Sequence, residues 1–150
     1  MQEPHYYDVT VTWQHDRKGI MQSDTLPDTI EVATPPEFTK GMPGIWSPEH
    51  LLVAAVNSCL MTTFLAIAEN SKLTFLSFTS KAIGKLEVID GKYLISEITL
   101  FPKIIISEEK DRERAERILQ KSEANCLISN TVKSNIHMET DIEVLTPDAV

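Results

Sequence analysis

The sequence predicts an α+β fold in which mostly antiparallel sheets wrap around a long, buried central helix. Strand-like segments stand in groups rather than alternating with helices, which is typical of α+β proteins. Residues 51–68 are apolar almost all round, and a helix without a polar face is buried on all sides. In a chain of 150 residues, such a helix needs a sheet wrapped around it or a partner subunit that covers one face.

The N-terminal part of the chain predicts short strands joined by a turn. Residues 6–14 alternate between apolar and polar side chains, which predicts a half-buried strand. The polar residues 14–19 predict a turn in which Gly19 takes unusual backbone dihedrals. Further strands are expected near residues 20–24 and 29–33, followed by an irregular loop over the Pro- and Gly-rich residues 35–46.

The central helix has a clear start signal. Ser47 can cap the helix, Pro48 fits the first helical position, and Glu49 complements the positive end of the helix dipole. Two long strands are expected at residues 75–89 and 92–106, joined by the hairpin signal Asp90-Gly91. A charged surface helix at residues 107–121 and a short helix at residues 126–134, capped by Asn125, follow. A strand at residues 137–145 closes the sheet.

Length and composition predict one domain over residues 1–150 and exclude several classes of protein. The net charge of −8 argues against nucleic acid and against an anionic membrane surface, since both bind clustered positive charge. No apolar run reaches the roughly 20 residues needed to cross a bilayer, and no secretory signal is visible. We therefore expect a cytoplasmic protein without membrane or nucleic-acid partners.

The two cysteines are the candidate chemical groups. Cys59 lies in the apolar helix, where a free cysteine usually behaves as a small buried hydrophobe. Cys126 begins a short helix beside polar residues, and a helix N-terminus favours the thiolate. Because the histidines show no metal-ligand spacing, we expect no metal site.

The arrangement as a whole resembles the OsmC/Ohr family, the osmotically inducible and organic hydroperoxide resistance proteins. The segment from Ser47-Pro-Glu-His-Leu to Cys59 is similar to the family helix that carries its peroxidatic cysteine. The segment Cys126-Leu-Ile-Ser-Asn130 is similar to the second cysteine motif, in which proline usually stands where this chain has Leu127. The strand-turn-strand start with Trp13 and Gly19 agrees with the same pattern.

The resemblance implies a thiol-dependent peroxidase that reduces organic hydroperoxides in an intertwined homodimer. Cys59 would be the peroxidatic cysteine, Cys126 the resolving cysteine, and Glu49 and Arg17 the family's glutamate and arginine. The turn around Arg17 lacks the glycine pair expected there. The family implies no metal or organic cofactor and a dithiol reductant such as dihydrolipoamide.

The chemistry of a peroxidatic thiol adds a requirement on geometry. An apolar helix raises a thiol pKa, so a cation must lower it, and Arg17 held by Glu49 is the candidate. Ten residues separate Glu49 from Cys59, about 15 Å along one helix. The simplest composite site therefore lies in a symmetric homodimer, where Glu49 of one subunit approaches Cys59 of the other.

The specificity and the reaction itself leave alternatives open. Met42, Ile45, Trp46 and Phe64 are the candidate side chains for a pocket that prefers bulky alkyl hydroperoxides. A non-catalytic dimer of the same fold that binds an apolar ligand would keep the cysteines as packing residues. Redox sensing through a Cys59–Cys126 disulfide ranks last, because the basic surface of a DNA-binding sensor is missing.

Overall fold

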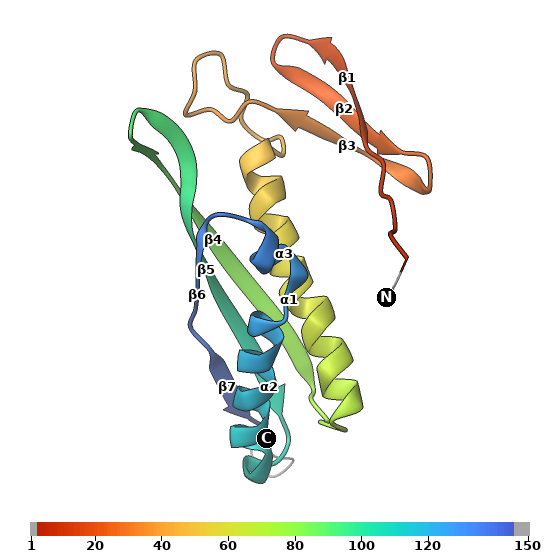
Figure 1. The fold of residues 1–150 in the computed structure, drawn as a ribbon, viewed down its shortest axis with the longest axis vertical. Helices are drawn as coiled ribbons and strands as arrows, with labels where there is room; N and C mark the ends of the chain where they lie inside the picture. Colours follow the sequence, from red (N-terminus) through yellow and green to blue (C-terminus); the bar gives the residue numbers. More distant parts are fainter. Residues whose placement is uncertain (1–2, 146–150) are drawn as a thin grey trace. The chain divides into compact units, whose positions relative to one another are not determined.

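The computed structural model describes residues 3–145, and the chain divides into two compact units. Unit 1 is Met1–Leu51 and unit 2 is Leu52–Val150. The single domain expected over residues 1–150 stays a prediction. The order of elements agrees with an α+β fold, with three strands, a long helix, a long hairpin, further helices and two short strands (Figure 1).

Unit 1 contains a three-stranded antiparallel sheet of β1 (Thr10–His15), β2 (Lys18–Ser23) and β3 (Leu26–Ala33). Every residue of β1 is exposed, so the half-buried strand expected there is not buried in the single chain.

The expectation for Gly19 was wrong. It lies within β2, and Asp16 takes the left-handed conformation of the turn with a φ of 49°. A Cβ at position 19 would lie 2.8 Å from the carbonyl oxygen of Thr12, so glycine is needed there for the close approach of two strands.

Unit 2 is built around a four-stranded sheet in which β5 (Lys92–Ile106) is central. β4 (Ser77–Ile89) pairs with it in antiparallel fashion through the Asp90-Gly91 turn. The two-residue hairpin turn expected at Asp90-Gly91 is confirmed, because both residues have positive φ. The strands β6 (Asn135–Met138) and β7 (Asp141–Val144) lie along the other edge of β5, and both are parallel to it.

The single closing strand expected at residues 137–145 is therefore two strands. Their registers against β5 are continuous, because Leu100 pairs with Met138 and Lys103 pairs with Asp141. The interruption falls opposite Pro102, which has no N–H to donate to a neighbouring strand. The parallel direction follows from the helices between β5 and β6, since a parallel pairing needs a long crossover connection.

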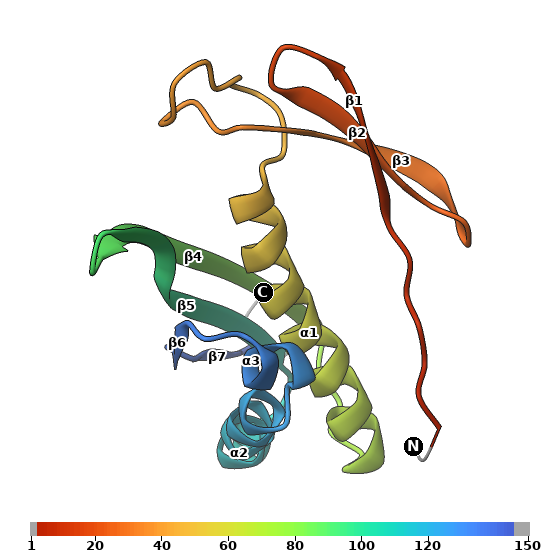
Figure 2. The same cartoon turned by 45° about the horizontal axis from the view of Figure 1, so that its top comes forward.

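The helices of unit 2 pack on one face of this sheet (Figure 2). They are α1 (Pro48–Asn70), of which residues 48–51 belong to unit 1, α2 (Arg112–Ala124), which follows the short 3-10 helix η1 (Glu109–Asp111), and α3 (Leu127–Thr131). Alternate residues of β5 from Ser96 to Ile106 are buried against them. The core has two clusters, one around Phe64, Ile104 and Leu119 and one around Leu60, Ile98 and Leu100.

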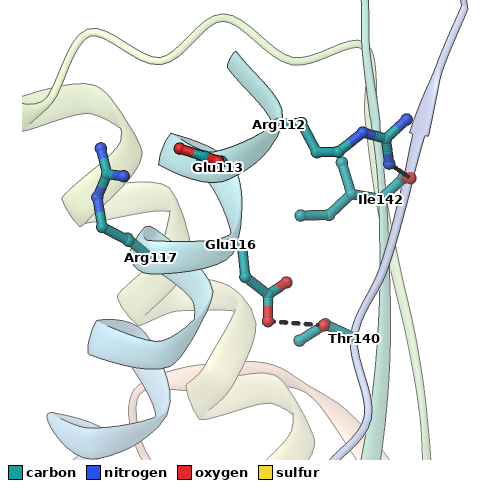
Figure 3. Close-up of a pocket in the computed structure, with 6 residues that line it drawn as sticks. All are labelled: Arg112, Glu113, Glu116, Arg117, Thr140 and Ile142. Atoms are coloured by element: carbon teal, nitrogen blue, oxygen red, sulfur yellow. Dashed lines mark hydrogen bonds between the residues drawn. The ribbon is translucent and has the colours of Figure 1, made fainter. Parts of the chain in front are cut away.

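Polar contacts hold α2 against β7 at the edge of the sheet. The Arg112 guanidinium donates to the carbonyl of Ile142 at 2.6 Å, and the Thr140 hydroxyl donates to the Glu116 carboxylate at 2.9 Å (Figure 3). These groups surround a shallow surface hollow of about 520 Å³. Because α3 follows directly after α2, this anchoring also positions Cys126.

Helix α1 is confirmed, but in the single chain it is not buried on all sides. Its buried residues recur every four positions, at Val56, Leu60, Phe64 and Ala68. Met61 and Leu65 remain 39% and 41% exposed. The sheet therefore covers one stripe of the helix and leaves another apolar face open.

The long apolar helix also corrects the expectation about membrane spans. Helix α1 has 23 residues and a mean hydropathy of 2.0 over an 18-residue window, which is long and apolar enough to cross a bilayer by length and composition. The core helix of a soluble protein satisfies the same criterion. This feature alone therefore does not assign the chain to a membrane.

Candidate active site

The structure brings Cys59 and Cys126 together within unit 2. Cys59 lies in the middle of α1 and is partly exposed, whereas Cys126 is fully buried at the start of α3. Both are free thiols, and the Cys126 thiol donates a hydrogen bond to the Cys59 sulfur. Residues that are 67 positions apart in the sequence thus form one cysteine pair.

A tight connection between α2 and α3 places Cys126. Asn125 ends α2, and its side-chain amide donates to the carbonyl of Lys121 at 2.8 Å. The Cys126 N–H donates to the carbonyl of Glu123 at 3.2 Å. The expectation that Asn125 caps the short helix was wrong, because Cys126 itself is the N-cap residue of α3.

Hydrogen bonds make Cys59 the more acidic cysteine. Burial raises the pKa of its thiol, but donors outweigh that effect and hold the pKa below its ordinary value. The donors are the Cys126 thiol, the backbone N–H groups of Ile128 and Leu127, and the Thr63 hydroxyl, whose oxygen is 3.9 Å from the Cys59 sulfur. Donors to the charged form of an acid stabilise that form.

Cys126 is shifted in the opposite direction. Burial raises the pKa of its thiol, and its hydrogen bond to Cys59 together with the negative charge on Cys59 raises it further. The side chain and the backbone N–H of Ser129 partly oppose this rise. The shifts therefore make Cys59 the more acidic thiol of the pair, the reverse of what the position of Cys126 at a helix start predicts.

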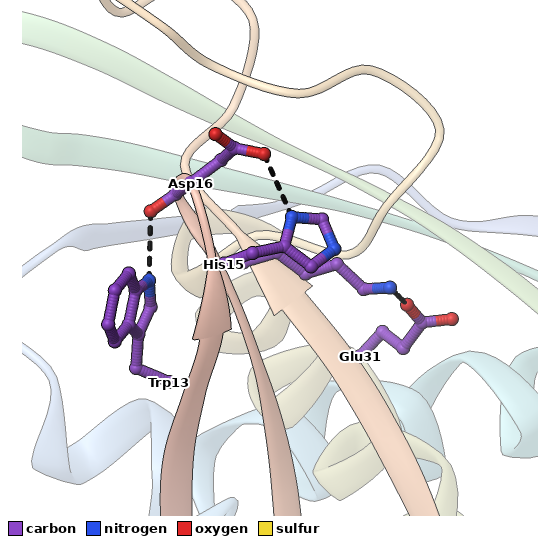
Figure 4. A network of polar contacts seen from close by, with 5 residues as sticks. Trp13, His15, Asp16 and Glu31 are labelled. Atoms are coloured by element: carbon purple, nitrogen blue, oxygen red, sulfur yellow. Dashed lines mark hydrogen bonds and ion pairs between the residues drawn. The ribbon is translucent and has the colours of Figure 1, made fainter.

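The arginine and glutamate candidates lie in unit 1. Arg17 is exposed in the turn between β1 and β2. The Trp13 indole donates to the backbone carbonyl of Asp16 at 3.0 Å, and the His15 ring contacts the Asp16 carboxylate at 2.8 Å (Figure 4). The carbonyl of Arg17 accepts a bond from the N–H of Thr34 at 3.2 Å. These contacts brace the turn from which the Arg17 side chain extends.

The predicted start of α1 is confirmed. Pro48 is its first residue, and the fully buried Ser47 accepts the backbone N–H of His50 on its hydroxyl oxygen at 3.1 Å. Glu49 is half-buried in the first turn. Helix α1 continues without a break through Glu49 and Cys59, so the rise of about 15 Å between them follows from ideal helix geometry.

The candidate pocket residues fall into two groups. Ile45 and Trp46 line a hollow of about 590 Å³ in unit 1, beside the ion pair between Lys18 and Glu31. Met42 is half-buried in the same loop. Phe64 has no exposed surface and stacks on Phe78 with ring centroids 5.0 Å apart. In the single chain Phe64 is therefore a core residue, which its helical spacing from Leu60 and Ala68 also favours.

Thr63 and the N–H groups of Leu127 and Ile128 were missed in the sequence, whereas Ser129 stood there as part of the second cysteine motif. Thr63 stands four residues after Cys59, a spacing that brings side chains together on a helix. Ser129 stands three residues after the N-cap residue Cys126, where capping contacts are common. The N–H groups of Leu127 and Ile128 have no signal of their own in the sequence. Within residues 3–145, no cluster of His, Cys, Asp or Glu is placed to hold a metal ion.

Comparisons with known proteins agree with this fold. The family model described as OsmC-like protein matches residues 41–141. The uncharacterized protein YmaD of Bacillus subtilis is 22% identical over 149 residues, which cover 96% of this chain and 97% of YmaD.

Solved structures extend the likeness to nearly the whole chain. An OsmC-like protein of unknown function from Vibrio cholerae has a TM-score of 0.83 at 23% identity and covers 91% of this chain and 99% of its own. An organic hydroperoxide resistance protein from Elizabethkingia anophelis has a TM-score of 0.76 at 20% identity and covers 97% of this chain and 100% of its own. At these identities the structures show a common fold, and together with the family model they establish that the chain belongs to the OsmC-like protein family.

Proposed function

We propose that this protein is a thiol-dependent peroxidase that reduces organic hydroperoxides to alcohols. The observation that carries the proposal is the cysteine pair, in which a partly exposed Cys59 of lowered pKa accepts a hydrogen bond from a buried Cys126. A thiolate is the nucleophile in peroxide reduction, and a resolving cysteine beside it prevents overoxidation. The organic hydroperoxide resistance protein from Elizabethkingia anophelis shares the fold and supports the same class of substrate.

The reaction takes place in three steps. The Cys59 thiolate attacks the terminal oxygen of ROOH, the O–O bond breaks, and RO⁻ takes a proton to leave as the alcohol. Cys59 is then a sulfenic acid. The Cys126 sulfur attacks the Cys59 sulfur, which forms the disulfide and releases water. A dithiol such as dihydrolipoamide reduces the disulfide by thiol exchange and becomes oxidised itself.

Arg17 and Glu49 complete the site in a homodimer. Arg17 stabilises the negative charge that moves from Cys59 to the departing alkoxide, and Glu49 orients the guanidinium. The separation of Glu49 and Cys59 along α1 favours a site shared between two copies of the chain. The open apolar face of α1, with Met61 and Leu65, and the exposed Trp13 and Val11 of β1 supply surface that a second copy would bury.

Substrate preference follows from apolar side chains near the composite site. We assign Met42, Ile45 and Trp46 to the alkyl group of the substrate, whereas Phe64 is a core residue of unit 2. A pocket of this kind favours bulky hydroperoxides over hydrogen peroxide. The net charge of −8 agrees with an enzyme that works in the cytoplasm without nucleic acid or membrane.

An anaerobic titration of the reduced protein tests this function. With about one equivalent of cumene hydroperoxide, we expect both thiols to be lost and an intrachain disulfide to form, as each turnover oxidises one cysteine pair. The Cys59→Ser variant should retain its thiol. The Cys126→Ser variant should stop at a sulfenic acid and proceed to a sulfinic acid with excess peroxide, as read by intact mass.

Two outcomes would contradict the proposal. Thiols that persist through the titration would make the cysteines packing residues and favour a binding protein for an apolar ligand. Equal rates with hydrogen peroxide and cumene hydroperoxide would remove the assignment of the apolar pocket. The matched variant Ser58→Ala, at an exposed neighbour of Cys59 on α1, should react as the wild type does.

A further inference from the structure

The Ser129 side chain is a buried hydroxyl for which packing alone gives no reason. It lies in α3, is 9% exposed, and its oxygen has no hydrogen-bond partner of normal geometry among residues 3–145. Buried polar groups nearly always have a partner. Three residues before it stands Cys126, the fully buried N-cap residue, and both the hydroxyl and the backbone N–H of Ser129 act on that sulfur.

We propose that Ser129 is a positioning residue that stabilises the Cys126 anion once Cys59 has been oxidised. The inference rests on the proposed function, because it concerns the second step of that reaction. In the reduced protein the Cys126 thiol donates its proton toward Cys59, so the Ser129 hydroxyl has no anion to bind. The hydroxyl can donate to the Cys126 sulfur only after that sulfur has lost its proton.

Oxidation of Cys59 removes two of the influences that raise the pKa of the Cys126 thiol. In the reduced protein, burial, the hydrogen bond to Cys59 and the charge on Cys59 raise the pKa of the Cys126 thiol. Among the ionisable side chains of residues 3–145, Cys59 alone raises the pKa of Cys126. A sulfenic acid at position 59 is neutral, so both contributions from Cys59 disappear while those of Ser129 remain. Cys126 therefore becomes more acidic only after the first step has taken place.

The step that Ser129 assists is the condensation of the two sulfurs. The Cys126 thiolate attacks the sulfenic sulfur of Cys59, the S–S bond forms and the S–O bond breaks. The hydroxide that leaves combines with the proton released by Cys126 and departs as water. The rate depends on the fraction of Cys126 that is thiolate, and this fraction is what a hydroxyl donor at Ser129 increases.

The first test is a titration that needs no peroxide. Cys59→Ser replaces the charged sulfur by a neutral hydroxyl and leaves Cys126 as the only cysteine, so the shift of its labelled Cβ carbon in NMR reports one thiol. We expect the Cys126 midpoint to be lower in Cys59→Ser than in the reduced wild type. Adding Ser129→Ala should raise it again by about one pH unit, a tenfold loss of thiolate at fixed pH.

The control is Ser122→Ala in the same background. Ser122 is also a fully buried serine, but its hydroxyl donates to the carbonyl of Ile118 at 2.6 Å within α2. This variant should leave the Cys126 midpoint unchanged. Equal midpoints with and without the Ser129 hydroxyl would overturn the proposal.

The second test follows the two chemical steps in the intact cysteine pair. Ser129→Ala should form the sulfenic acid at the wild-type rate and the disulfide about tenfold more slowly at neutral pH, in proportion to its lost thiolate. The rates of disulfide formation in Ser129→Ala and in the wild type should become equal at high pH, where Cys126 is ionised in both. Ser129→Thr should restore the rate at neutral pH. A deficit that is the same at every pH would make Ser129 a packing residue. A wild type that loses no thiols to the peroxide would instead overturn the proposed function. The pH titration of Cys126 in the first test does not depend on that function.

Discussion

The two units of the chain differ in how much of their apolar surface they bury by themselves. In unit 1, Val11 and Trp13 of β1 are 64% and 73% exposed. In unit 2, alternate residues of β5 are buried from Ser96 to Ile106, beneath helices that contribute side chains such as Phe64. Unit 2 therefore carries its own core, whereas unit 1 presents apolar strands that only another surface can cover.

This difference divides the proposed active site into two parts. Cys59, Cys126 and the donors that lower the Cys59 pKa all belong to unit 2, so one chain's own packing arranges them. Arg17 and Glu49 belong to unit 1. We expect the nucleophile to depend on the stability of unit 2, and the arginine and glutamate to depend on assembly with a second copy.

The largest expected effect comes from the core of unit 2. Phe64→Ala removes a fully buried ring that contacts Phe75 and Phe78, with centroids 5.2 and 5.0 Å away. We expect a loss of about 3–5 kcal/mol in the free energy of unfolding, as for other buried Phe residues. Urea denaturation followed by circular dichroism measures it. A loss below about 1 kcal/mol would show that unit 2 does not depend on this core.

The next effect tests whether a second copy covers unit 1. Trp13→Ala removes a ring that is exposed in the single chain and whose indole donates to the Asp16 carbonyl, so the single chain should lose about 1 kcal/mol or less. If the homodimer buries Trp13, we expect a loss of about 2 kcal/mol, typical of an aromatic residue central to an interface. The unfolding midpoint of the wild type should then rise with protein concentration.

Sedimentation of the same two proteins completes that test. The wild type should sediment as a dimer and Trp13→Ala as a weaker one. Tyr93→Ala, at an exposed position of β5 in unit 2, is the matched aromatic control and should leave the mass unchanged. A wild type that sediments as a single chain with full activity would remove the composite site.

The smallest effect concerns the N–H of Leu127. Leu127→Pro deletes this donor at the first position of α3, where proline fits and where the preceding Cys126 already has an extended ψ of 113°. Because the N–H lowers the Cys59 pKa, its loss should move the alkylation midpoint upward by a few tenths of a pH unit. At a fixed neutral pH, Cys59 should then react about twofold more slowly.

The sign of this pH dependence follows from the wild type. A lowered pKa means that Cys59 is alkylated at a lower pH than an ordinary cysteine, and that its reactivity falls as the pH falls through the lowered pKa. Leu127→Ala keeps the N–H and should match the wild type. An unshifted midpoint in Leu127→Pro would mean that the Ile128 N–H and the Cys126 thiol suffice.

Local chemistry in the sequence was enough to place most elements and the start of the site. The cap formed by Ser47 and Pro48, the hairpin at Asp90-Gly91 and the long apolar helix each follow from preferences that act within a few residues. The same motifs identified Cys59 and Cys126 as the groups of interest. The interruption between β6 and β7 was missed because it depends on Pro102 in a neighbouring strand.

Only the tertiary structure decided which cysteine is the more acidic. Judged by its own segment, Cys126 at a helix start is the more acidic thiol, and Cys59 in an apolar helix is the less acidic one. Packing reverses this order, because it buries Cys126 and directs its proton, together with the Leu127 and Ile128 N–H groups, toward the Cys59 sulfur. A pKa reflects every donor and charge near the group, and these come from segments far apart in the sequence.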